Sequence, residues 1–98
     1  MQATWTVPVD HPAFAGHFPG RPIVPGVVLV DRAILLASRF HDCQPGGLRL
    51  GSAKFLSPVG PGEVLQFSFQ TTQSGALQFS VRAGDREVAA GSFSFHRD

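Results

Sequence analysis

The chain has 98 residues, of which 43% are hydrophobic, and this is enough to form one domain with its own core. The net charge of +1 and the scattered Lys and Arg residues argue against a nucleic-acid partner. The single cysteine, Cys43, excludes an internal disulfide framework and fits a cytoplasmic protein. No signal-peptide pattern is visible, and the apolar run within residues 23–37 is too short to span a membrane, so we expect no membrane partner.

Hydrophobic periodicity predicts several strands and one helix. Residues 3–9 form the first predicted strand, and a loop rich in Pro and Gly follows it. The helix begins at Pro25 and Gly26, where a missing amide donor does no harm, and it runs to Phe40. Its side chains are apolar on nearly every side, which predicts a helix enclosed by other structure. The remaining strands are predicted at residues 48–56, 64–72, 77–81 and 87–95.

This order of elements indicates an α+β domain over residues 1–98. We expect a curved antiparallel β-sheet that wraps around one long central apolar helix. Periodicity alone also admits other arrangements of a sheet on a helix.

The stretch from His11 to Asp31 is where we expect the chemistry. Its prolines stiffen the loop and its glycines permit unusual dihedrals, so we expect His17 to be held in place as a base or proton shuttle. Asp31 has apolar neighbours one turn before and one turn after it on the helix. We therefore expect its carboxyl group to be partly desolvated and to carry a proton near neutral pH, as a general acid does. Such a pair suits elimination or hydration.

The same residues resemble the active-site signature of the beta-hydroxyacyl-ACP dehydratases of the FabA/FabZ type, which have the hot-dog fold. The agreement includes the spacing of 31 − 17 = 14 residues between histidine and acid. A second, weaker match is the run from Lys54 to Glu63. The matching positions of the first motif are Gly16, His17, Phe18, Pro19, Gly20, Pro22, Pro25, Gly26, Val27 and Asp31.

The resemblance implies a role for each matched residue. His17 would remove the α proton of a 3-hydroxyacyl thioester, and Asp31 would protonate the departing hydroxyl. Gly26 and Val27, at the helix start, would bind the thioester carbonyl, because free amides and the helix dipole favour negative charge there. The loop residues Phe18, Pro19 and Pro25 would shape the site.

The resemblance also implies partners. The substrate would be held on the phosphopantetheine arm of acyl carrier protein, and no metal or redox cofactor would be needed. The histidine of one subunit would work with the acid of another, so we expect a homodimer or a higher oligomer of dimers. Basic residues are the candidates for contact with the acidic carrier or the phosphate of the arm. These are Arg21, Arg32, Arg39 and Lys54.

One position departs from the pattern. The family often has Gln four residues after the acid, where this chain has Leu35. The FabA branch typically has Asp at the position of the acid and the FabZ branch has Glu, so Asp31 resembles FabA. The short length of the chain instead resembles FabZ or the small dehydratases of aryl polyene pathways.

Two other functions remain open at this stage. A hot-dog thioesterase would use the same pocket to hydrolyse the thioester, although the His17 loop argues against it. A catalytically silent domain that binds acyl groups is the other, and Leu35 keeps it in consideration. Without the resemblance, His17 would be read as a turn residue and Asp31 as a buried cap for neighbouring amides.

Overall fold

The structure is a computed structural model that describes residues 1–10, 24–40 and 45–95. Its elements follow the predicted order, with a short 3-10 helix added before the second strand. They are β1 (Gln2–Thr6), α1 (Gly26–Phe40), η2 (Pro45–Gly47), β2 (Leu48–Phe55), β3 (Val64–Thr71), β4 (Leu77–Ala83) and β5 (Arg86–Phe95).

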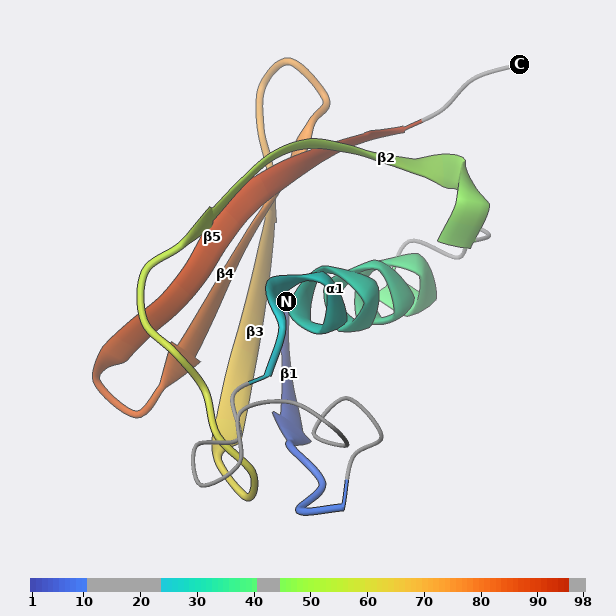
Figure 1. The fold of residues 1–98 in the computed structure, drawn as a ribbon. Coiled ribbons are helices and arrows are strands. Elements are labelled where there is room, and N and C mark those ends of the chain that lie inside the picture. Colours follow the sequence, from blue (N-terminus) through green and yellow to red (C-terminus); the bar gives the residue numbers. More distant parts are fainter. Residues whose placement is uncertain (11–23, 41–44, 96–98) are drawn as a thin grey trace.

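The five strands form one antiparallel sheet in the order β1-β3-β4-β5-β2. Figure 1 shows the sheet curving, with α1 lying against one of its faces. The strands β1 and β2 lie at the two edges. The predicted α+β architecture is therefore confirmed among the described residues.

Alternation along the strands separates the two faces of the sheet. Leu65, Phe67 and Phe69 of β3 are buried on the face that α1 covers. The register pairs Phe67 with Val81 and Phe69 with Phe79, so the apolar rows continue onto β4. Burying a side chain of this size contributes about 1.5–3 kcal/mol. This face holds the core, whereas the opposite, outer face carries the alternating polar side chains.

The helix is less enclosed than its composition predicts. Its buried residues are Leu29, Val30, Ala33, Leu36, Ala37 and Ser38. Val27, Asp31 and Leu35, four residues apart, form an exposed stripe along another side. The prediction of enclosure on every side is wrong for the single chain.

Strand ends differ from the prediction by a few residues. The first strand ends at Thr6 rather than at residue 9, and a turn follows at residues 9–10. Val7, the next residue, still pairs with the segment before β3. The Val7 amide donates a hydrogen bond of 2.9 Å to the Glu63 carbonyl, and the Gly62 amide donates one of 2.8 Å to the Val7 carbonyl. Gly62 has a φ of 81°, a conformation that glycine adopts without strain.

Candidate active site at the start of the helix

The predicted site residues fall into two groups. His17, Phe18 and Pro19 lie outside the described residues. Pro25, Gly26 and Val27 lie at the start of α1, and Asp31 lies on its next turn. The structure thus places the proposed carbonyl-binding residues and the proposed acid on one helix, about one turn apart.

The start of α1 is anchored to the segment that joins β2 to β3. The amide of Val24, which is buried, donates a hydrogen bond of 2.7 Å to the carbonyl of Val59, also buried. The first amides of a helix have no acceptor within the helix and carry the positive end of its dipole. Anchoring therefore fixes a set of amides that can polarise a carbonyl oxygen.

Asp31 lies on the exposed stripe of α1. The prediction that its helix neighbours desolvate it is wrong for the single chain, because Val27 is 64% exposed and Leu35 is 39% exposed. The Asp31 side chain is itself exposed. Its neighbours among the described residues leave Asp31 open to water.

An apolar cavity of about 270 Å³ adjoins the helix start. Gly26 and Leu29 line it from α1, and Phe55, Leu56 and Pro58 line it from the end of β2 and the segment after it. The cavity lies beside the amides that could bind a thioester carbonyl, so it offers room for an apolar group attached to that carbonyl.

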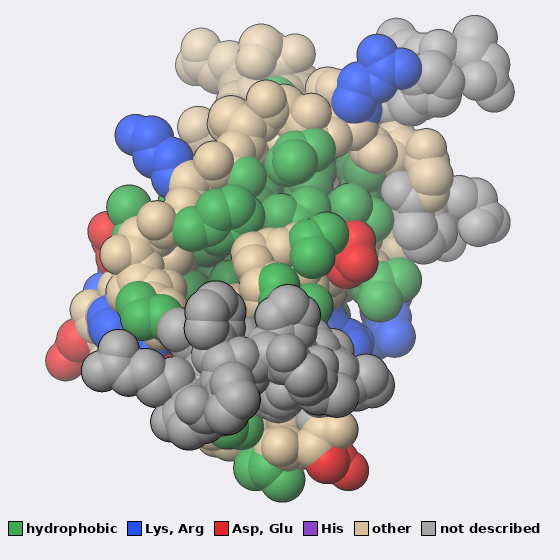
Figure 2. All heavy atoms as spheres, viewed as in Figure 1, with side chains coloured by type: hydrophobic (Ala, Val, Ile, Leu, Met, Phe, Trp, Pro, Cys, Tyr) green, Lys and Arg blue, Asp and Glu red, His purple; other side chains and the backbone are tan. Residues whose placement is uncertain are grey.

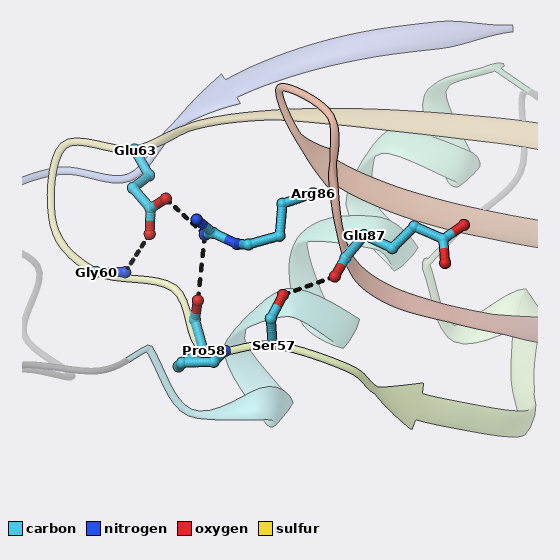
Figure 3. A network of polar contacts seen from close by, with 6 residues as sticks. All are labelled: Ser57, Pro58, Gly60, Glu63, Arg86 and Glu87. Atoms are coloured by element: carbon cyan, nitrogen blue, oxygen red, sulfur yellow. Dashed lines mark hydrogen bonds and ion pairs between the residues drawn. The ribbon is translucent and has the colours of Figure 1, made fainter.

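A network of polar contacts braces the same segment (Figure 3). Arg86 of β5 reaches Glu63 at 2.6 Å and donates to the Pro58 carbonyl at 3.2 Å. The other carboxylate oxygen of Glu63 accepts a bond of 2.7 Å from the Gly60 amide. Nearby, the Ser57 hydroxyl donates to the Glu87 carbonyl at 2.6 Å. The segment that anchors α1 is therefore held by β5.

These contacts lower the pKa of Glu63. The hydrogen bond from the Gly60 amide is the largest cause, partial burial opposes it, and the hydrogen bond and charge of Arg86 add to it. In the sequence, Glu63 ends the weaker motif and has no predicted partner. Arg86 lies 23 residues further along the chain, and no local pattern indicates the pair.

The basic residues proposed for carrier contact are dispersed. The guanidinium of Arg32 lies over the ring of Trp5, 4.6 Å from its centroid, in a cation–π contact. Arg39 is exposed at the end of α1, and Lys54 is exposed on β2. Arg21 lies outside the described residues. The structure does not gather the described members of this set into one basic patch.

A second, larger hollow of about 750 Å³ lies on the outer face of the sheet, away from the helix start. Its lining mixes apolar residues with polar ones, among them Gln2, Ser52, Lys54, Gln70, Gln78 and Ser92. Volume alone would make this hollow the candidate active site. Gly26, a predicted site residue, instead lines the smaller, apolar cavity, and we place the candidate site there.

Within the described ranges, no three His, Cys, Asp or Glu side chains come together to hold a metal ion. No helix in this part of the chain is long and apolar enough to cross a membrane.

Known dehydratases are similar to this chain in sequence. The model of a family described as "ApeI-like: ApeI dehydratase" matches residues 1–92. A 3-hydroxyacyl-[acyl-carrier-protein] dehydratase FabZ of Syntrophotalea carbinolica is 36% identical over 87 residues, or 79% of this chain and 59% of the relative. The FabZ of Chlamydia trachomatis is 34% identical over 102 residues, or 91% of this chain and 67% of the relative. This chain thus spans about three fifths to two thirds of the length of these relatives.

A solved structure shares the fold. A chain of the dehydratase heterocomplex ApeI:P from Xenorhabdus doucetiae superposes with a TM-score of 0.78 at 24% identity, covering 98% of this chain and 86% of that chain. The sheet order, the helix against the sheet and this likeness identify the hot-dog fold. With the family model matching residues 1–92, the chain belongs to the ApeI-like dehydratase family.

Proposed function

We propose that this protein removes water from 3-hydroxyacyl thioesters and yields trans-2-enoyl thioesters, with the acyl chain held on acyl carrier protein. The observation that carries the proposal is the anchored start of α1. There an apolar cavity lies beside Gly26, the amides of Gly26 and Val27 begin the helix, and the acid Asp31 follows about one turn later, in a member of a dehydratase family.

In the proposed reaction His17 takes the proton from C2 of the acyl chain. The electrons of that C–H bond form the C2–C3 double bond, and the C3–O bond breaks. Asp31 supplies the proton with which the hydroxyl leaves as water. The amides at the start of α1 stabilise the negative charge that develops on the thioester oxygen meanwhile. The step needs no oxidant or reductant, since its atoms and electrons balance within the substrate and the two side chains.

The exposed apolar residues support a dimer as the active form. Val27 and Leu35 lie on the exposed stripe of α1, while Leu50, Phe55 and Leu56 are exposed on β2 and just after it. Figure 2 shows hydrophobic side chains gathered on the face that carries α1 and β2. An apolar surface of this kind commonly marks an interaction site. A second copy seated here would take Asp31 out of water and bring a second His17 loop into the assembly.

We also infer a cytoplasmic location and no further domain within residues 1–98, which rest on the single cysteine and the one-domain length.

The proposal is tested with purified protein and 3-hydroxyacyl thioesters on acyl carrier protein, following the ultraviolet absorbance of the conjugated enoyl product. We expect the wild type to interconvert the two thioesters. We expect His17→Ala and Asp31→Asn each to lower kcat by about a hundredfold or more, as for the loss of a general base or acid.

Two other results would replace the proposal. Release of free thiol without an enoyl product would identify a thioesterase. Binding of acyl carrier protein with neither reaction, on chains of several lengths, would identify a silent acyl-binding domain.

A further inference from the structure

The ring of Phe55 covers the start of α1. Phe55 is the last residue of β2, and its side chain is 53% exposed. A Cβ atom built on Gly26 would lie 2.7 Å from Cζ and 2.8 Å from Cε1 of this ring, closer than side chains pack. The ring therefore occupies the place that a side chain at residue 26 would take, and glycine there permits the contact.

This contact sets the position of the ring relative to a bound thioester. If the Gly26 amide holds the thioester carbonyl, the first carbons bonded to that carbonyl lie close to the Phe55 ring. Two groups extend from the carbonyl, the acyl chain and the pantetheine arm. The arm carries amides and a hydroxyl, whereas the cavity beside the ring is lined mainly by Leu29, Leu56, Pro58 and Phe55 itself. The lining suits the acyl chain.

The cavity is small for this purpose. Its volume of about 270 Å³ falls just under the range of about 300–1,000 Å³ that is usual for small-molecule sites. The ring of Phe55 fills space that a longer chain would need.

We propose that Phe55 is a specificity-determining residue that restricts the protein to short acyl chains, by walling the apolar cavity next to Gly26. The proposal rests on the proposed function for the position of the thioester. It adds the substrate class and the residue that selects it.

The test compares Phe55→Ala with Leu50→Ala. Both residues are exposed apolar side chains on β2, at 53% and 45%, but Leu50 does not line the cavity. The ratio of kcat/KM for long-chain over short-chain 3-hydroxyacyl thioesters should rise about tenfold or more in Phe55→Ala, since each methylene in an apolar pocket changes the rate by at least that factor. Leu50→Ala should leave the ratio unchanged, because any effect through the apolar surface alone would appear in both variants.

A binding measurement separates this proposal from the proposed function. Saturated acyl-pantetheines of increasing length cannot be dehydrated, and calorimetry gives their Kd without catalysis. Tighter binding of long chains by Phe55→Ala alone would support the role of Phe55, even if the wild type dehydrates nothing. An unchanged length dependence in both the rate and the binding series, or the same shift in Leu50→Ala, would overturn it.

Discussion

Glu63 and Arg86 form a better placed ion pair than Arg82 and Glu87 do. Glu63 is the more buried partner, its carboxylate is 2.6 Å from Arg86, and it also accepts a hydrogen bond from Gly60. The Arg82–Glu87 pair is longer, at 3.4 Å, and the side chain of Glu87 is 66% exposed against 31% for Glu63. An exposed pair such as Arg82–Glu87 contributes little to stability. The Glu63–Arg86 pair is strengthened by hydrogen bonds that both side chains make to backbone groups.

Glu63→Gln should therefore lower stability in a pH-dependent way. The folded chain lowers the pKa of Glu63 from its ordinary value of 4.5, so the ionised group stabilises the fold above that value. This contribution is lost as the pH falls through the lowered pKa. We expect the variant to lose about 1 kcal/mol of unfolding free energy at neutral pH, a figure kept small because Arg86 is half exposed.

Urea denaturation of wild type and variant at neutral and at acidic pH measures this difference. It should shrink toward zero in acid, where Glu63 is protonated in both states. Glu87→Gln is the matched control and should change stability little at either pH. A Glu63→Gln effect that is equal at both pH values would show that charge does not stabilise this segment.

The elements of the sheet and the helix could be predicted from local patterns. Pro25 and Gly26 mark the start of α1, and alternation marks β3 to β5, because side-chain periodicity reports secondary structure directly. What surrounds an element does not follow from its own sequence. The stripe through Asp31 is apolar in composition and yet exposed, since the helix buries only one side in the sheet of its own chain.

The candidate site, like the fold, could be predicted from the sequence only in part. The motif identified Gly26, Val27 and Asp31 as residues of one site, and the structure places them at the start of one helix. The ring of Phe55 against Gly26 and the brace from Arg86 depend on contacts between distant elements. Neither follows from periodicity or spacing.

The exposed stripe of α1 yields a prediction about assembly. Leu35→Lys places a charge in the middle of the proposed interface, where it would be buried without a partner. We expect the dimer dissociation constant to rise at least about tenfold, or about 1.4 kcal/mol, while the monomer stays folded. Val64→Lys is the control, because Val64 is also exposed but belongs to the outer face of the sheet.

Sedimentation velocity over a range of concentrations distinguishes the two variants. A wild type that stays monomeric throughout would contradict the proposed interface. Equal weakening by Leu35→Lys and Val64→Lys would do so as well. Assembly only after mixing with a different hot-dog chain would point to a heterologous partner on the same surface.

At the level of the whole molecule, the two faces of the sheet have different characters. The inner face and α1 hold the core and end in an exposed apolar surface, whereas the outer face carries the alternating polar side chains of the strands. The proposed acid, Asp31, lies on the apolar side and is exposed in the single chain. We therefore expect the active site to form between two chains, with His17 supplied by one and Asp31 by the other.

The most direct test of that claim is activity in a mixed dimer. His17→Ala and Asp31→Asn subunits carry different affinity tags and are co-expressed, and dimers that hold both tags are purified. Each parent homodimer lacks a working site, but the mixed dimer has one intact and one doubly defective site. We predict about half of the wild-type dehydration rate for the mixed dimer, as one of two symmetric sites is restored. A mixed dimer as inactive as its parents would contradict the account, because it would place both residues of each site in the same chain.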